Sequence, residues 1–305
     1  MINLSIIMKE RALFFNNLRS FTLIATFFSL WFAVYFQDNV EDFFAYFLIL
    51  SLGILHGAND IKLIEKTSKT VQKKRFYKIL ILYLLIISIS IILFYFLPTI
   101  ALFLFVIFSA YHFGEQHLNS KITQQTFISK MMFLVYGIVI LSVLFYNNSF
   151  EVSRIIENIT GIYFKKDFYL YSLSISSLSL IVLGFKIYFD GQLKAKIVEE
   201  IFYILVFFIV FYTASLLWAF AIYFIFWHSI PSLADQVYYL YGNNKKENFI
   251  KYLKSSFIYW FISIVGLSLL YWLFHAQDRL FLSIFFTLIA SITFPHVWVM
   301  SKFNK

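Results

Sequence analysis

Four histidines inside long hydrophobic runs carry most of the chemistry that this sequence could perform. They occur in the stretches "LHGAND", "YHFGEQH", "FWHSIPSLADQ" and "FPHVWV", as His56, His112, His228 and His296. A titratable group inside a membrane span is costly, and its presence there indicates a function. Neutral imidazole binds zinc, copper, iron and nickel, so the four together predict a metal site without choosing the metal. A histidine-rich site with open positions suits ferrous iron and dioxygen, while zinc hydrolysis would need a water-filled route for a polar substrate.

Two carboxylates accompany these histidines at helical spacing. Asp60 follows His56 by four residues and Glu115 follows His112 by three, so each pair shares one helix face. A histidine bound to a metal usually donates its other N–H to a carboxylate or a carbonyl, which is the role expected of Asp60 and Glu115. The same four groups could instead form the proton or ion relay of a transporter. Further polar groups lie nearby in the sequence, namely Asn59, Gln116, Asp235 and Gln236.

The elements that carry these residues are predicted to be membrane-spanning helices. Of the 305 residues, 61% are hydrophobic and 13% charged, and a soluble domain is usually much more polar. A spanning helix needs about 20 mostly apolar residues. On that criterion the sequence predicts an all-α, polytopic bundle of about ten transmembrane helices, with a range of eight to ten, forming a single transmembrane domain over 1–305. The predicted spans are 21–36, 42–61, 79–97, 98–118, 131–146, 168–189, 199–217, 219–241, 256–274 and 280–301.

The net charge of +9 is interpreted as membrane topology, not as a nucleic-acid surface. With a cytoplasmic N-terminus, 21 of the 25 Lys and Arg residues fall in segments on the cytoplasmic side. This positive-inside bias predicts ten spans with both termini in the cytoplasm, in the cell inner (plasma) membrane. The absence of cysteine from the sequence excludes disulfides, thiolate metal ligands and a cysteine nucleophile.

This topology predicts that the four histidines share one level. The spans that carry them all run from outside to inside. Counted from the outer ends, His56 and His112 are about 14 residues in, His296 about 16 and His228 about nine. At ~1.5 Å per residue the first three lie at a similar depth, and His228 joins them if its span starts lower or tilts. The other two histidines are His117, near an inner helix end, and His275, in a short external turn.

Four motifs in this order, "LHGAND", "SAYHFGEQH", "YFIFWHS" and "FPH", resemble the Brp/Blh family of bacterial and archaeal β-carotene 15,15′-dioxygenases. The resemblance implies oxidative cleavage of the central double bond of β-carotene by dioxygen, which gives two all-trans-retinal. It implies ferrous iron as cofactor, with His56, His112, His228 and His296 as its ligands, and a microbial rhodopsin as recipient of the retinal. Membrane lipid would deliver the substrate.

Ser232 departs from the family pattern, because family members often carry a second histidine at this position, four residues after the tryptophan–histidine pair. Another group, most simply His296 or a water, would then complete the ligand set, or the activity would differ. Non-catalytic binding of a carotenoid or retinal is therefore an alternative. A di-iron desaturase would need more closely spaced histidine pairs than the chain has. Aromatic residues beside the ligands are the predicted walls of an apolar substrate tunnel: Tyr111, Phe113, Phe226, Trp227, Phe294 and Trp298.

Overall fold

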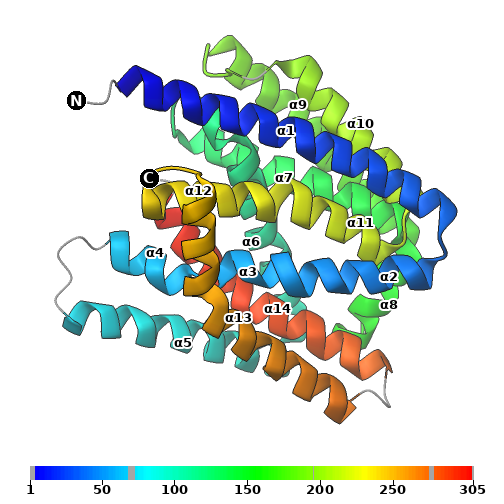
Figure 1. The fold of residues 1–305 in the computed structure, drawn as a ribbon. Coiled ribbons are helices and arrows are strands. Elements are labelled where there is room, and N and C mark those ends of the chain that lie inside the picture. Colours follow the sequence, from blue (N-terminus) through cyan, green and yellow to red (C-terminus); the bar gives the residue numbers. More distant parts are fainter. Residues whose placement is uncertain (1–3, 68–72, 195, 275–277, 304–305) are drawn as a thin grey trace. The chain divides into compact units, whose positions relative to one another are not determined.

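The computed structural model describes residues 4–67, 73–194, 196–274 and 278–303, and these residues are almost entirely helical (Figure 1). Over these ranges the β-pairing consists of an isolated bridge between Ile122 and Leu193. The all-α class is therefore confirmed. Among the residues that the structure describes, eight helical stretches are long and apolar enough to cross a membrane: Lys9–Tyr35, Asp38–Lys66, Tyr77–Phe96, Pro98–Lys121, Phe127–Asn147, Lys166–Phe189, Leu216–Tyr241 and Lys246–Leu269.

All ten predicted spans fall on helices, but two do not reach spanning length in the described residues. Helix α10 (Ile197–Thr213) has 17 residues, and the apolar part described in α14 (Asp278–Phe303) is Thr287–Ser301. The helix break predicted at Pro98 is confirmed, because proline begins α6 (Pro98–Leu118). The break expected near residue 218 lies a few residues earlier, between α10 and α11 (Leu216–Ile222). The connection 147–167 contains a helix that was not predicted, α8 (Ser149–Thr160). The cytoplasmic location of the termini stays a prediction, and His275 lies outside the described residues.

The chain divides into two compact units, each assembled from separate parts of the sequence. The first comprises Met1–Lys66 and Thr213–Val265, and the second Thr67–Tyr212 and Gly266–Lys305. That the two act as a single transmembrane domain stays a prediction. The first unit holds α1 (Leu4–Tyr35), α2 (Asp38–Leu48), η1 (Ile49–Gly53), α3 (Ile54–Gly57), α4 (Asp60–Thr67), α11, η3 (Tyr223–Ser229), α12 (Ile230–Tyr241) and the first part of α13 (Lys246–Phe274). The second holds α5 (Lys73–Phe96), α6, η2 (Asn119–Lys121), α7 (Phe127–Asn147), α8, α9 (Lys166–Phe189), α10 and α14.

In the first unit, α2 lies along α11, as the light blue and yellow ribbons of Figure 1 show. Ser215 caps α11: its hydroxyl accepts from the backbone N–H of Trp218, which satisfies one of the free donors of the first turn. The buried carboxylate of Glu41 in α2 accepts the N–H of Ser215 at 2.7 Å. Helix α1 joins this layer through Ser29, whose carbonyl accepts the indole N–H of Trp218. These hydrogen bonds fix the position of α11, and η3, which carries His228, directly follows α11 in the chain.

In the second unit, α7 is the central helix and α6 and α9 pack against it. The apolar part of α7 is 67% buried, whereas the same measure for α5 and α9 is 11%. An apolar helix with so little burial presents its side chains to lipid in a membrane protein. Helix α14 packs against α5 and α6, and this brings the last histidine motif beside the second one.

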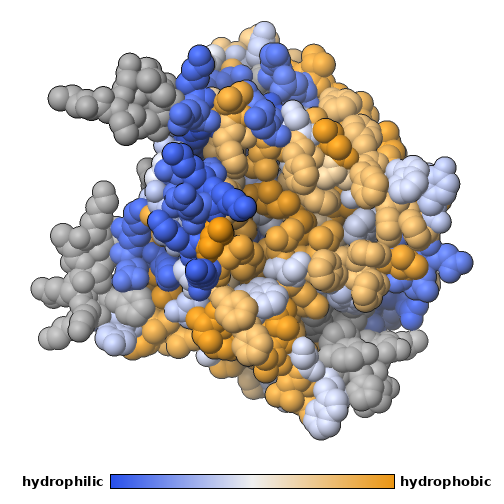
Figure 2. Space-filling view, viewed as in Figure 1, coloured by the Kyte–Doolittle hydropathy of each residue, from blue (hydrophilic) through white to orange (hydrophobic). Residues whose placement is uncertain are grey.

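Hydrophobic side chains also dominate the molecular surface. Figure 2 shows them over much of the visible face, with hydrophilic residues gathered towards helix ends. Trp31 on α1 and Phe43 on α2 are 50% and 65% exposed. Exposed apolar area on this scale is unstable in water and suits a lipid environment.

Candidate metal centre

The first unit contains a pair of buried histidines, His56 and His228. Their rings meet edge to face with centroids 5.2 Å apart, and each offers a ligand nitrogen within 4.8 Å of the other's. Two nitrogens that bind one transition metal, each at about 2.1 Å, are at most ~4.2 Å apart. A small side-chain adjustment therefore suffices for both imidazoles to bind the same ion.

Both histidines are associated with π-helical turns. Segment η1 ends three residues before His56, and η3 contains His228. The two segments pack against each other. Gly53, the last residue of η1, makes this approach possible, because a Cβ there would lie 2.8 Å from the Phe224 ring. π-Helical turns are rare and frequently occur at functional sites.

Hydrogen bonds fix the orientation of His56. Its Nδ1 lies 2.5 Å from the carbonyl of Gly53, which only accepts, so Nδ1 carries the proton and Nε2 keeps its lone pair. The backbone carbonyl of His56 accepts from Gln236 at 2.9 Å and from Tyr252 at 3.3 Å. The Gly53 carbonyl thus has the role towards His56 that the sequence suggested for Asp60, namely to accept its ring N–H. Asp60 is buried, and its role towards a histidine stays a prediction.

Ser232 is completely buried in α12, four residues after His228. Its hydroxyl accepts from the side-chain amide of Gln236 at 3.2 Å, and Gln236 accepts from the Tyr252 hydroxyl at 2.7 Å. This chain of hydrogen bonds ends on the carbonyl of His56. Ser232 therefore belongs to a polar cluster behind His56, and Gln236, which the sequence suggested to be near the site, does as well.

The second unit contains the other pair, His112 on α6 and His296 on α14. Their rings also meet edge to face, with centroids 5.2 Å apart, and their side chains are 1% and 5% exposed. Pro295 lies within α14 directly before His296. The sequence predicted four histidines at one level. Within each unit, the structure shows two of these histidines as a pair with adjacent rings. That the pairs bind one common ion stays a prediction.

Close packing of α6 on α7 holds His112. A Cβ on Gly114 would lie 1.8 Å from the carbonyl oxygen of Phe133, and one on Gly137 would lie 1.8 Å from that of Ala110. Only glycine permits such an approach between two backbones. The position of His112 relative to the unit's central helix therefore depends on these two glycines.

Glu115, the predicted partner of a histidine, accepts a hydrogen bond from the Tyr111 hydroxyl at 3.1 Å. Tyr111, a predicted tunnel wall, is thereby tied to the carboxylate that follows it by one helical turn. Phe113 is buried, with its ring 6.5 Å from that of His112. Phe294 packs edge to face on Phe108. The part of each in binding a substrate stays a prediction.

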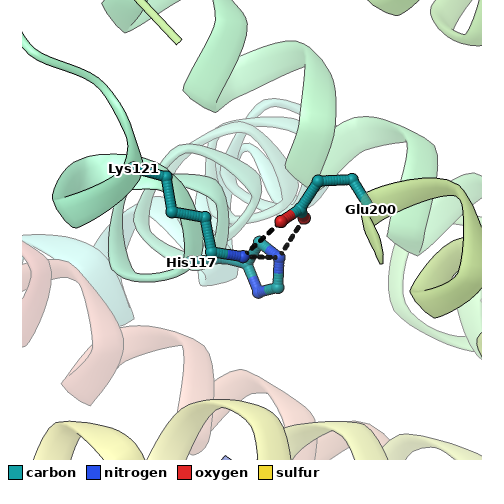
Figure 3. A network of polar contacts seen from close by, with 3 residues as sticks. All are labelled: His117, Lys121 and Glu200. Carbon is teal, nitrogen blue, oxygen red and sulfur yellow. Dashed lines mark hydrogen bonds and ion pairs between the residues drawn. The ribbon is translucent and has the colours of Figure 1, made fainter. Parts of the chain in front are cut away.

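His117 belongs to a separate polar network, drawn in Figure 3. The Glu200 carboxylate lies 2.7 Å from His117 Nε2 and 2.6 Å from Lys121 Nζ, and these two side chains point at it from the end of α6 and from η2. The His117 ring stacks on Tyr136 with centroids 4.7 Å apart. This network ties the end of α6 to the first turn of α10, which is a structural role.

Sequence reasoning chose wall residues adjacent to His228 in the chain and missed Phe224. The indole N–H of Trp227 donates to the Thr26 hydroxyl at 2.9 Å, so this ring is anchored on α1. Phe226 and Trp298 are half-buried. Phe224 instead stacks on His228 at 5.7 Å and meets His56 edge to face at 5.5 Å. The sequence could have indicated Phe224 through its position four residues before His228, because residues with this spacing share a helix face.

Comparison with known proteins gives one match. The model of the β-carotene 15,15′-dioxygenase family matches residues 47–304, a stretch that contains all four paired histidines. Neither the curated proteins nor the solved structures give a match to the chain.

Proposed function

The chain belongs to the β-carotene 15,15′-dioxygenase family, and on this premise we propose that it cleaves the central double bond of β-carotene with dioxygen. One carbon–carbon double bond breaks and two carbonyl groups form, so one β-carotene and one dioxygen give two all-trans-retinal without a further reductant. The observation that carries the proposal is the family match over residues that include both histidine pairs.

The residues present fit a metal cofactor. All four are buried imidazoles, and the hydrogen bond from His56 to Gly53 leaves a ligand nitrogen on the other side of the ring. We propose that His56, His112, His228 and His296 hold ferrous iron, a metal that imidazole suits. When bound, iron would supply the activation of dioxygen that organic side chains do not provide.

The other site residues orient these ligands and exclude water. The carbonyl of Gly53 sets the tautomer of His56, and the cluster of Ser232, Gln236 and Tyr252 holds the backbone that follows it. Glu115 and Asp60 supply buried carboxylates near the ligands. Proposed wall residues for the apolar substrate are Tyr111, Phe113, Phe226, Trp227, Phe294 and Trp298.

The composition supports a membrane location for this reaction. β-Carotene dissolves in the bilayer. Three of the eight spanning candidates contain His56, His112 and His228, and His296 lies in the shorter apolar helix Thr287–Ser301. We propose the inner (plasma) membrane as the location, lipid as the medium that delivers the substrate, and a microbial rhodopsin as a recipient of the retinal.

Expression in cells that accumulate β-carotene tests the proposal directly. The parent chain is expected to yield retinal, quantified by chromatography, and His56→Ala and His228→Ala are expected to yield none while pigment is retained. His275→Ala is the matched control, expected to keep parental activity. Iron in the purified proteins is measured in parallel, and both silent variants should bind less.

Absence of retinal from a well-expressed, iron-loaded parent would overturn the cleavage proposal. If pigment then co-purifies with the protein, non-catalytic carotenoid binding replaces it. The variant to make next would be Ser232→His, which introduces the histidine that the family pattern has at this position.

A further inference from the structure

Three aromatic rings form a continuous row in the first unit, and His228 is its last member. The Phe220 and Phe224 rings are stacked with centroids 5.2 Å apart and planes 10° from parallel. Phe224 and His228 continue the stack at 5.7 Å and 19°. The three rings therefore form an offset stack whose ring edges follow one another along the helix to a proposed metal ligand.

The i, i+4 spacing of the three residues accounts for this row, because residues four apart lie on one face of a helix. Phe220 belongs to α11, and Phe224 and His228 belong to η3. The row therefore runs from the end of α11 into the π-helical turn.

Two members of the row are partly exposed. Phe220 and Phe224 are both half-buried, unlike the fully packed Ile222 and Ile225 of the same stretch. Gly53 faces Phe224 and leaves no Cβ beside the ring. Phe224 also meets His56 edge to face, so this ring contacts both histidines of the unit.

We propose that Phe220 and Phe224 form an aromatic rail that binds the conjugated chain of the substrate and sets its position relative to His228. The inference rests on the proposed function for the identity of the substrate, a linear conjugated hydrocarbon. A polyene is flat and presents a π-face, and edge-to-face contact of aromatic ring edges with that face adds to the gain from burial alone. The rail thus favours a conjugated chain over a saturated chain of the same length.

Binding to metal-free protein tests the rail without catalysis. β-Carotene is titrated into the purified protein in detergent, and its induced circular dichroism is followed, with fully hydrogenated β-carotene as competitor. Phe220→Leu keeps an apolar side chain and does not touch a histidine. Loss of one aromatic contact with the polyene is expected to weaken β-carotene binding about threefold to tenfold and to reduce the preference over the saturated competitor. Phe27→Leu is the matched control, since Phe27 is 48% exposed on α1.

A second variant displaces the rail without removing a ring. The Cβ of Gly53→Ala would lie 2.8 Å from Phe224 Cε1, and the rings stacked on either side limit the retreat of Phe224. We expect weaker β-carotene binding and, in the iron-loaded protein, a larger share of off-centre cleavage products. Gly266→Ala is the control, because a Cβ at Gly266 meets nothing within 4 Å.

The two proposals fail in different ways. Parental affinity and parental preference in both Phe220→Leu and Gly53→Ala would overturn the rail, whether or not the parent makes retinal. A parent that makes no retinal but binds β-carotene through Phe220 would overturn the cleavage proposal and support the rail.

Discussion

Replacement of Gly114 by alanine should separate α6 from α7 and disturb the histidine pair of the second unit. The added Cβ would lie 1.8 Å from the carbonyl oxygen of Phe133, which falls short of the 3.4 Å of ordinary contact by 1.6 Å. The obstacle is backbone of the unit's central helix, so no side-chain rotation relieves it. The same close approach occurs in reverse at Gly137, against Ala110, so separation of the helices at Gly114 also loosens the packing at Gly137.

The cost follows from two opposing terms. Overpacking a close-packed interior costs typically 1–3 kcal/mol and occasionally more, and a backbone obstacle places Gly114→Ala at about 3 kcal/mol. Alanine regains about 1 kcal/mol of helix propensity. The net loss of about 2 kcal/mol corresponds to a fall in Tm of roughly 4–8 °C for a chain larger than 150 residues.

Thermal unfolding in detergent, followed by tryptophan fluorescence, measures this effect. Gly184→Ala in α9 is the matched control, because the nearest atom to its Cβ would be Met132 Cε at 3.9 Å. It should keep or slightly raise the Tm. Iron content should fall in Gly114→Ala, because His112 lies two residues before the displaced position. A Tm for Gly114→Ala equal to that of Gly184→Ala would refute the account of α6–α7 packing.

Three further outcomes are expected. Glu200→Gln should lower the free energy of unfolding by about 1–3 kcal/mol, because it removes a charged hydrogen-bond partner of the partly buried Lys121 ammonium, and chemical denaturation would measure it. Thr22→Val should cost about 1–3 kcal/mol in the same measurement, because the hydroxyl donates to the backbone carbonyl of Phe226 at 3.2 Å. Chelation of the metal should lower the Tm of the parent and ferrous iron should restore it, whereas the Tm of His56→Ala should not respond to either.

Hydropathy was enough to predict which residues form helices, because a membrane-spanning segment must satisfy its backbone internally. It could not predict α8, since the stretch around Arg154 is only weakly apolar. Helical spacing predicted Asp60 and His56 on one helix face, but a turn at residues 58–59 places them on α4 and α3. The tautomer of His56 is set by a carbonyl, which no side-chain pattern encodes. The pairing of His112 with His296 required tertiary contacts between helices distant in the sequence.

The π-helical turn at His228 could not be predicted from the sequence, and Pro231 illustrates the reason. The sequence predicts a kink at this proline, because proline lacks the N–H of a regular helix. In η3 the N–H of Ile230 bonds to the carbonyl of Ile225, five residues back. The carbonyl of Phe226 would by the same pattern take its donor from residue 231, where none exists. The hydroxyl of Thr22 on α1 donates to it instead. A distant threonine therefore supplies the hydrogen bond that the proline withholds, and the wider turn that carries His228 persists because α1 supports it.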